Sequence, residues 1–218
     1  MRFSDRRAAG AALAAPLAHY AHRDDVVVLA LPRGGVPVGY EVAEALDVDL
    51  DIFLVRKLGL PGHPEYAMGA IATGGVRVLN EEAIGWCRIP KAVIDSVIAD
   101  EQRELERREQ AYRGGRPGAA IADRVAILVD DGLATGSSMR AGVTAVRRLR
   151  PSRIVVAVPV GAPATCRQMQ QIADEVVCLR MPEPFSAVGQ GYDDFSQTSD
   201  DEVESLLRGR PTYWPRLS

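Results

Sequence analysis

One run of sequence, from Val125 to Ser138, places the strongest constraint on the fold of this chain. The apolar residues Val125–Val129 are bounded by Arg124 and Asp130 and show no polar alternation, which predicts a strand buried on both faces of a parallel sheet. Asp130 and Asp131 follow at the carboxyl end of that strand, beyond which open α/β sheets bind their ligands. The run therefore predicts an α/β fold with a binding site at this edge of the sheet.

The residues after the acidic pair have the composition of an anion-binding loop: Gly132, Ala134, Thr135, Gly136, Ser137 and Ser138. Small residues let the backbone approach a ligand closely, and their N–H groups begin a helix whose positive end favours a phosphate. The two carboxylates can accept hydrogen bonds from the vicinal hydroxyls of a ribose. A plain turn at a strand end is the alternative, but such a turn does not require Thr-Gly-Ser-Ser after it. The pattern therefore indicates a sugar-phosphate site.

A second segment, Val26–Leu46, repeats the order of buried strand, glycine-rich turn and helix. Its turn contains Arg33, Gly34 and Gly35, and the glycine spacing differs from that of the dinucleotide fingerprint. By itself the segment is equally typical of an ordinary turn between a strand and a helix. It gains weight because the same arrangement occurs in Val125–Ser138.

Together, the two segments resemble the motifs of the type I phosphoribosyltransferases, which bind 5-phosphoribosyl 1-diphosphate (PRPP). The resemblance extends from Val26 to about Phe195. It implies the fold of that family: α/β, with a central parallel sheet flanked by helices, a flexible loop or hairpin and a small C-terminal hood. Residues 1–218 would then form a single domain, with a core at about 24–180 and the hood at about 181–218.

The resemblance also implies roles for individual residues near the acidic pair. Asp130 and Asp131 would bind the ribose hydroxyls of PRPP and take part in catalysis. Lys57 is a further catalytic candidate, because it ends the next predicted strand where it could attract the diphosphate, with a solvated strand end as the alternative. The loop Gly132–Ser138 would hold the 5-phosphate.

Further roles fall on the first turn and the hood. The turn Arg33–Gly35 would hold the diphosphate, with the Arg33–Gly34 peptide bond in the cis form or able to adopt it with ligand. In the hood, Phe185 and Val188 would contact the base, and Asp193 would approach Mg²⁺, the expected cofactor. A core aromatic residue and surface acids are the alternative for the hood residues.

The reaction implied by the resemblance is the displacement of diphosphate from C1 of PRPP by a ring nitrogen, with Mg²⁺ neutralising the leaving group. Members that act on 6-oxopurines have an Asp where this chain has Ala134, and a Lys in the region of Pro159 and Val160. Hypoxanthine and guanine are therefore not expected as acceptors, and the acceptor stays open. A non-catalytic PRPP-binding regulator or uptake protein is the alternative, whereas an α/β hydrolase is excluded because no G-x-S-x-G motif occurs.

The composition argues against several partners and compartments. A net charge of −3 and an isoelectric point near 5.7 provide no basic surface for nucleic acid. Three widely spaced cysteines form neither a C-x-x-C pair nor a zinc pattern, which favours a reduced cytoplasm. The Ala-rich amino terminus superficially resembles a secretory signal, but Leu13, Leu17 and Tyr20 have the spacing of an amphipathic helix. We therefore expect a cytoplasmic protein without nucleic-acid or membrane partners.

The region between the two motifs contains one predicted strand and one predicted loop. Residues Asp49–Leu58 have the pattern of a strand, and Asp47, Asp49 and Asp51 that of loop and strand-entry charges. Residues Gly59–Tyr66 are dense in Gly and Pro, which predicts a loop.

A hairpin and a long helix are predicted next. Two short strands surround Gly74–Gly75, which predicts a hairpin. An insertion at this point resembles the mobile loop that covers the site in type I phosphoribosyltransferases, with Lys57, His63 and Glu65 as its polar candidates. An ordinary loop histidine is the alternative for His63. Residues Pro90–Arg113 predict one long charged helix, whose polar second half fits a solvated face, with a homodimer contact as the alternative.

Overall fold

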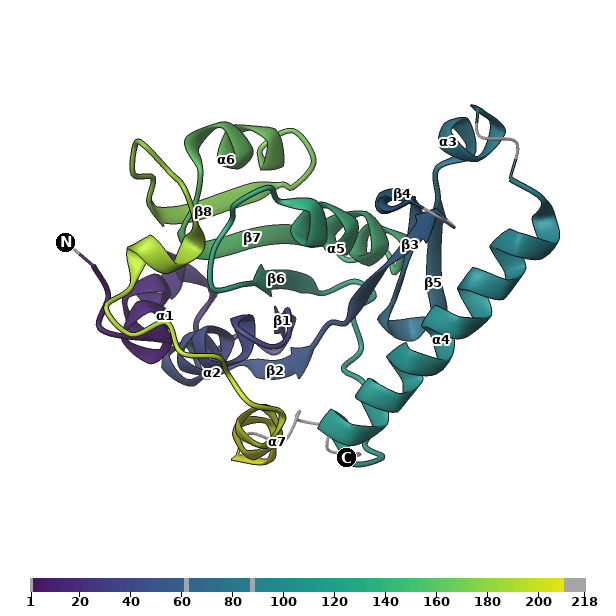
Figure 1. The fold of residues 1–218 in the computed structure, drawn as a ribbon. Coiled ribbons are helices and arrows are strands. Elements are labelled where there is room, and N and C mark those ends of the chain that lie inside the picture. Colours follow the sequence, from purple (N-terminus) through teal and green to yellow (C-terminus); the bar gives the residue numbers. More distant parts are fainter. Residues whose placement is uncertain (1, 61–62, 87–88, 210–218) are drawn as a thin grey trace.

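A five-stranded parallel sheet forms the centre of the protein (Figure 1). The computed structural model describes residues 2–60, 63–86 and 89–209, without the side chains of residues 60–67 and 83. The strand order is β2-β1-β6-β7-β8, and every neighbouring pair is parallel. The strands are β1 (Val26–Ala30), β2 (Asp49–Ile52), β6 (Val125–Val129), β7 (Arg153–Val160) and β8 (Glu175–Arg180). The predicted central parallel sheet is thereby confirmed.

Helices cover both faces of this sheet (Figure 1). One face carries α1 (Arg6–Ala14), the 3-10 helix η1 (Ala15–Tyr20) and α2 (Gly35–Leu46), and the other carries α5 (Ser137–Arg148) and α6 (Pro163–Met169). Alternate residues of β1 enter the two cores: Val26, Val28 and Ala30 pack with the first group of helices, and Val27 and Leu29 with the second. Since both faces are buried, the strands carry no polar alternation, as the sequence predicted.

A second, antiparallel sheet has the order β3-β4-β5 and projects from the first (Figure 1). Its strands are β3 (Val55–Leu60), β4 (His63–Ala72) and β5 (Val76–Leu79), followed by α3 (Glu81–Trp86) and α4 (Lys91–Arg113). The short 3-10 turn η2 (Thr73–Gly75) joins β4 to β5, so the predicted hairpin is confirmed. Gly74 and Gly75 both have positive φ, 78° and 72°, which other residues rarely adopt.

The predicted strand Asp49–Leu58 is wrong, because the chain forms two strands there. It leaves the parallel sheet after Ile52, and the N–H of Leu54 donates to Oγ1 of Thr73 at 2.9 Å. The backbone of Thr73 returns a hydrogen bond to the carbonyl of Leu54 at 3.0 Å. This exchange redirects the next residues into the antiparallel sheet.

The predicted loop Gly59–Tyr66 is also wrong in part, because β3 continues to Leu60 and β4 begins at His63. The register between the two strands shifts on both sides of Gly59. Such a bulge lets a Gly- and Pro-rich sequence remain paired. The side chains of His63 and Glu65 lie outside the described part of the chain.

The long helix predicted at Pro90–Arg113 is confirmed as α4. It lies along the antiparallel sheet and ends near the parallel one (Figure 1). The buried residues of α4 include four of the predicted apolar positions, namely Ile94, Ile98, Leu105 and Tyr112. None of the described helices is long and apolar enough to cross a membrane.

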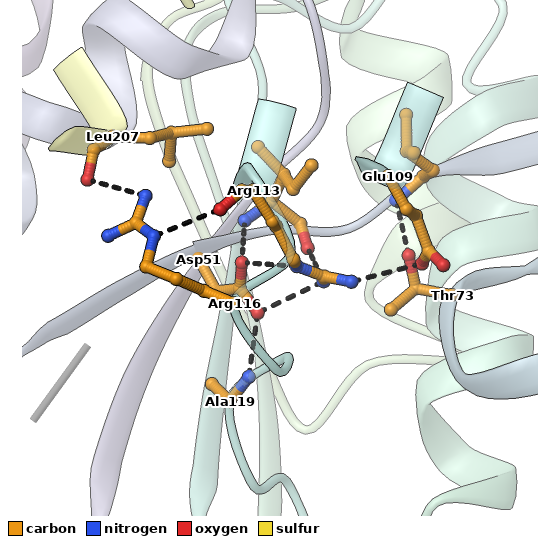
Figure 2. A network of polar contacts seen from close by, with 9 residues as sticks. Asp51, Thr73, Glu109, Arg113, Arg116, Ala119 and Leu207 are labelled. Carbon is orange, nitrogen blue, oxygen red and sulfur yellow. Dashed lines mark hydrogen bonds and ion pairs between the residues drawn. The ribbon is translucent and has the colours of Figure 1, made fainter. Parts of the chain in front are cut away.

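A buried ion pair joins the end of α4 to β2 (Figure 2). Arg113 donates from Nε to Oδ1 of Asp51 and from Nη2 to Oδ2, both at 3.0 Å. The N–H of Ala119 donates to the same Oδ2 at 2.7 Å, and Nη2 of Arg113 also donates to the carbonyl of Ile52 at 3.0 Å. Arg116 extends the network by donating to the carbonyls of Arg113 and, at 3.2 Å, of Leu207.

This network corrects the interpretation of the aspartates before and within β2. Asp51 is a buried structural acid, only 6% exposed, rather than a strand-entry charge. Asp49 accepts a hydrogen bond from Nη2 of Arg124 at 2.7 Å, which ties β2 to the start of β6. Asp47 remains a loop charge, at the left-handed residue that ends α2.

The C-terminal part forms a small cap over α1 and α2. The 3-10 helix η3 (Val188–Gly191) lies beside the amino terminus, where Phe3 pairs in parallel with Tyr192. The last helix, α7 (Asp200–Gly209), packs against both α2 and α4. The predicted hood is therefore present over its described residues.

Replacing Asp51 with Asn is expected to destabilise the fold by about 3–5 kcal/mol, because the buried guanidinium of Arg113 then lacks its counter-charge. Urea unfolding at pH 7 measures the change in the free energy of unfolding. The control is Asp24→Asn, at an exposed position before β1, with an expected change within about 0.5 kcal/mol. A loss below about 1 kcal/mol for Asp51→Asn would show that the pair contributes little to holding α4 on β2.

Candidate functional site

The carboxyl ends of β1 and β6 lie next to each other in the parallel sheet. Residues Val26–Ala30 pair in register with Val125–Val129, and the N–H of Leu31 donates to the carbonyl of Val129 at 2.9 Å. The helices that follow these strands, α2 and α5, lie on opposite faces of the sheet (Figure 1). This is the topological switch point at which open α/β sheets bind ligands. Both sequence motifs therefore meet at one place.

The acidic pair stands at the end of β6 with one oxygen of each carboxylate held by the protein. Oδ1 of Asp130 accepts the N–H of Asp131 at 2.9 Å. Oδ2 of Asp131 accepts Nε of Arg6 at 2.8 Å. Within the described residues, no hydrogen bond engages Oδ2 of Asp130 or Oδ1 of Asp131, and both residues are partly exposed. Two acceptor oxygens are thus open to a ligand.

The electrostatic environment of the two carboxyls differs. Burial raises the pKa of Asp130 well above its ordinary value, and the negative charge of Asp131 raises it further. Burial also raises the pKa of Asp131, but the hydrogen bond and positive charge of Arg6 oppose that effect. The negative charge of the pair is therefore more favourable on Asp131 than on Asp130.

Neighbouring segments hold the loop after the acidic pair: the N–H of Leu133 donates to the carbonyl of Val160 at 2.9 Å, and that of Ser137 makes a long contact of 3.5 Å with Oγ1 of Thr135. Oγ1 of Thr165 donates to the carbonyl of Ala134 at 2.6 Å, and Leu133 pairs with Gly161 after β7. Gly136 has φ of 72°, and a Cβ atom there would lie 2.6 Å from Cγ2 of Thr165. The helix α5 begins at Ser137, and its first N–H groups have no partner within the helix. The backbone thus offers an anion site at a helix amino terminus.

The turn after β1 packs directly against the acidic pair. A Cβ atom on Gly34 would lie 2.0 Å from Oδ2 of Asp131, and one on Gly35 would lie 2.7 Å from the carbonyl of Val129. Both positions therefore require glycine. The cis peptide bond expected at Arg33–Gly34 is instead found at Pro32–Arg33, one bond earlier. Gly34 itself has helical dihedral angles, with φ of −61° and ψ of −30°, and precedes the first residue of α2.

The side chain of Arg33 points toward the amino terminus of α7. Its Nη1 atom lies 3.7 Å from Oδ1 of Asp200, which also accepts the hydroxyl of Tyr112 at 2.6 Å. Burial is the main cause that raises the pKa of Tyr112 to about 12. Arg33 keeps partial exposure, so its guanidinium is accessible beside the turn.

The expected base-contacting residues pack on one apolar cluster, and Val188 also approaches the loop after the acidic pair. Phe185 and Val188 pack on the apolar cluster that contains Val160 and Tyr192. Val188 contacts the loop after β6, because a Cβ atom on Gly132 would lie 2.4 Å from its Cγ1 atom. The structure therefore brings the hood to the same edge of the sheet.

Two of the expected site residues, Lys57 and Asp193, are exposed, and the described hydrogen bonds of the acidic pair do not include them. Lys57 is exposed on β3, opposite Ala70 of β4. Asp193 is exposed in the hood, where its N–H donates to the carbonyl of Phe3 at 2.8 Å. Among the described residues, no three His, Cys, Asp or Glu side chains form a group that could hold a metal ion.

Sequence reasoning missed the residues that support Asp131 from the amino terminus and the hood. Arg6 donates from Nη1 to the carbonyl of Ser196 at 2.6 Å, and its Cζ atom lies 4.0 Å from the centre of the Phe195 ring. The hydroxyl of Tyr192 donates to the backbone carbonyl of Asp131, and burial raises the pKa of this tyrosine. No local pattern marks these residues, because their partners are distant in the sequence.

Comparisons with family models and with curated proteins point to the same family. A family model described as the phosphoribosyl transferase domain matches residues 5–194. A Mycobacterium tuberculosis protein, provisionally named a phosphoribosyl transferase in strains CDC 1551 / Oshkosh and H37Rv, is 46% identical over 205 residues. That match covers 94% of this chain and 46% of the relative, so the chain spans about half the length of the curated relatives it matches.

Solved structures resemble the whole chain. TT1426 from Thermus thermophilus, a protein of known crystal structure, is 45% identical in sequence to this chain, and the two structures superpose with a TM-score of 0.86. The match covers 96% of this chain and 99% of TT1426. The AQ2163 protein from Aquifex aeolicus is 9% identical with a TM-score of 0.50, over 84% of this chain and 78% of that one. At this identity the second likeness concerns the fold alone.

Replacing Asp130 with Asn is expected to stabilise the protein at pH 7. Because the pKa of Asp130 is raised in the folded state, ionisation of this carboxyl costs stability. The folded protein therefore becomes progressively less stable as the pH rises above 3.8, the ordinary pKa of the group. The neutral amide removes that cost, so the thermal midpoint should rise by at least about 2 °C.

Thermal unfolding at pH 7 and at pH 4 measures this effect. The difference between the variant and the natural protein should narrow at pH 4, where Asp130 is increasingly protonated and therefore neutral. Asp123→Asn, at an exposed position before β6, is the control. A lower midpoint for Asp130→Asn at pH 7 would contradict the account of the pair.

Proposed function

Because the chain belongs to the phosphoribosyl transferase family, we propose that it moves a 5-phosphoribosyl group from PRPP to a nitrogenous acceptor and releases diphosphate. The type I phosphoribosyltransferase fold predicted from the sequence is confirmed by the family match and by the likeness to TT1426. One observation carries the proposal. The two open carboxylate oxygens of Asp130 and Asp131 stand beside an anion-binding loop, as a ribose 5-phosphate requires.

In this proposal the acidic pair and its loop bind the pentose half of PRPP. Oδ2 of Asp130 and Oδ1 of Asp131 accept hydrogen bonds from the two ribose hydroxyls. The backbone N–H groups between Ala134 and Ser138, together with the amino terminus of α5, bind the 5-phosphate. The side chains of Thr135, Ser137 and Ser138 stand around the same loop, where Oγ1 of Thr135 lies 3.0 Å from Oγ of Ser137.

The turn after β1 would hold the leaving group. The Arg33 guanidinium supplies positive charge, and the glycines let the backbone approach the diphosphate. Positive groups beside the departing oxygens stabilise the charge that develops as the bond to C1 breaks. The acidic pair meanwhile holds the ribose so that the nitrogen of the acceptor meets C1. Lys57 remains a proposed catalytic residue that would approach from β3.

Mg²⁺ is part of this proposal. Magnesium sites that include substrate phosphates use only one or two protein carboxylates, so the lack of a three-residue metal group among the described residues fits this mode of binding. We assign Asp193 as the carboxylate that would approach the ion. When bound, Mg²⁺ would neutralise the charge of the diphosphate.

The nitrogenous acceptor is proposed to be neither hypoxanthine nor guanine. Ala134 provides no carboxylate beside the loop, and its carbonyl is already bonded to Thr165. Val160 is fully buried, and its side chain stands within contact distance of Gly132 and Gly191. Neither the Ala134 nor the Val160 side chain can therefore hydrogen-bond to the polar edge of a 6-oxopurine. Phe185 and Val188 form the proposed base-facing surface.

The wider setting is also proposed rather than observed. The composition favours a cytoplasmic protein whose partners are PRPP and the acceptor, with neither nucleic acid nor membrane. The exposed polar residues in the second half of α4 fit a solvated face, with a homodimer contact as the alternative.

Changing Asp130 and Asp131 together to Asn is expected to weaken PRPP binding by about 10-fold or more, because amides replace the carboxyl groups that accept from the two ribose hydroxyls and the negative charge of the pair is lost. Isothermal titration calorimetry on the folded variant measures this affinity. The double variant Asp24→Asn and Asp123→Asn places the same substitutions before β1 and β6, at the opposite edge of the sheet, and should bind as the natural protein does. Unchanged affinity in the site variant would refute the ribose assignment.

Hypoxanthine and guanine are expected to be poor acceptors, because a site without matching polar groups leaves buried atoms of the base unpaired. Diphosphate release with PRPP and Mg²⁺ tests them against adenine, pyrimidines and non-nucleobase amines. Efficient turnover of either 6-oxopurine would contradict the assignment. PRPP binding without turnover of any acceptor would favour the non-catalytic regulator or uptake protein.

A further inference from the structure

We propose that Arg6 is a positioning residue of the PRPP site, which fixes the Asp131 carboxylate so that its Oδ1 atom faces the ribose. The inference rests on the proposed function, since it gives Asp131 the ribose-binding role. It concerns the first residue of α1, far in sequence from both PRPP motifs.

The start of α1 fixes the direction from which Arg6 approaches. Asp5 is the N-cap residue of this helix, and its Oδ1 atom accepts the N–H of Ala8 at 2.8 Å. An N-cap of this kind sets where the helix begins and thereby which way its first side chains point. The neighbouring Arg7 instead lies at the surface, with 59% of its side chain exposed. Its Nε atom pairs with Oε1 of Glu41 at 2.6 Å.

Three separate contacts hold the Arg6 guanidinium. Its Nε atom donates to Asp131, its Nη1 atom donates to the carbonyl of Ser196, and its plane lies over the Phe195 ring. A cation over an aromatic face gains further attraction when it is shielded from water, and only 12% of this side chain is exposed. The guanidinium is therefore a fixed group rather than a mobile surface charge.

Arg6 and Gly34 enclose the same oxygen of Asp131. A Cβ atom on Gly34 would lie 2.0 Å from Oδ2 of Asp131 and 3.2 Å from Nε of Arg6. The Oδ2 atom is thus occupied between the turn and the guanidinium. The carboxylate cannot rotate without breaking the bond to Arg6, so its other oxygen keeps one orientation.

Arg6 is also the cation in contact with the acidic pair among the described residues. The titratable groups that face Asp131 are Asp130 on the same turn, Tyr192 in the hood and Arg6 on α1. Two of these three groups are acids, so only Arg6 favours the charged form of Asp131. Without it, none of the described groups that face Asp131 would be a cation.

The amino terminus should stay in place when the Arg6 side chain is shortened. Backbone hydrogen bonds attach it to the hood: Phe3 donates to the carbonyl of Gly191 at 2.9 Å, and Asp194 donates to that of Ser4 at 2.9 Å. The hydroxyl of Tyr192 independently holds the carbonyl of Asp131. Substitution of Arg6 should therefore remove its contacts with Asp131, Ser196 and Phe195 without releasing the amino terminus, and the double-mutant cycle separates the contact with the carboxylate from the other two.

The test is a double-mutant cycle on ligand affinity. PRPP and ribose 5-phosphate are titrated separately by calorimetry into the natural protein and into Arg6→Met, Asp131→Asn and the combined variant. Arg6→Met is expected to weaken both ligands by about tenfold. In the Asp131→Asn background the same change should cost less than about threefold, because Arg6 then has no carboxylate to hold.

Two further variants control the experiment. Arg7→Met removes the adjacent arginine and should leave both affinities unchanged. Arg6→Lys retains a positive charge but loses the planar contact with Phe195, so its affinity should lie between those of Arg6→Met and the natural protein. Thermal unfolding verifies that each variant is folded, and Arg6→Lys replaces Arg6→Met in the cycle if the latter does not fold.

The outcomes separate this inference from the proposed function. An equal loss in both Asp131 backgrounds would mean that Arg6 contacts the ligand directly and would overturn the positioning role. Unchanged affinity in Arg6→Met would overturn it as well. Failure of the natural protein to bind either PRPP or ribose 5-phosphate would instead refute the proposed function, and this inference with it.

Discussion

The pairing of β1 with β6 is the constraint on which the site depends. Their hydrogen bonds bring the turn after Ala30 and the acidic pair after Val129 to one edge of the sheet. Because α2 and α5 then leave toward opposite faces, the two loops diverge around the same position. Gly34 and Gly35 allow this approach, since a side chain at either position would overlap the end of β6.

The second requirement is electrostatic. Adjacent carboxyls in a partly dry site oppose each other's ionisation, so the protein supplies a counter-charge from Arg6 and a backbone N–H for Asp130. The negative charge is therefore distributed unequally over the pair. Holding it there lowers the stability of the folded protein, a trade-off that is common at binding sites. The opposite arrangement occurs at Asp51 and Arg113, where a buried carboxylate and its counter-charge join β2 to the end of α4.

Local patterns predicted the parallel sheet, the hairpin, the long helix and the loops that form the site, because each depends on neighbours in sequence. Arg6 and the Asp51–Arg113 pair could not be predicted in the same way. The sequence alone does not distinguish a buried arginine or aspartate from an exposed one, because the partner of each lies far away in the sequence. The break after Ile52 was missed for the same reason, since Thr73 redirects the strand from 19 residues away.

The most direct test of the account is a crystal structure of the protein with PRPP. The account predicts that the two ribose hydroxyls lie within about 3.2 Å of Oδ2 of Asp130 and Oδ1 of Asp131. It also predicts the 5-phosphate on the backbone of the loop that leads into α5. PRPP bound elsewhere, or bound here with both carboxylates facing away from the ribose, would contradict it.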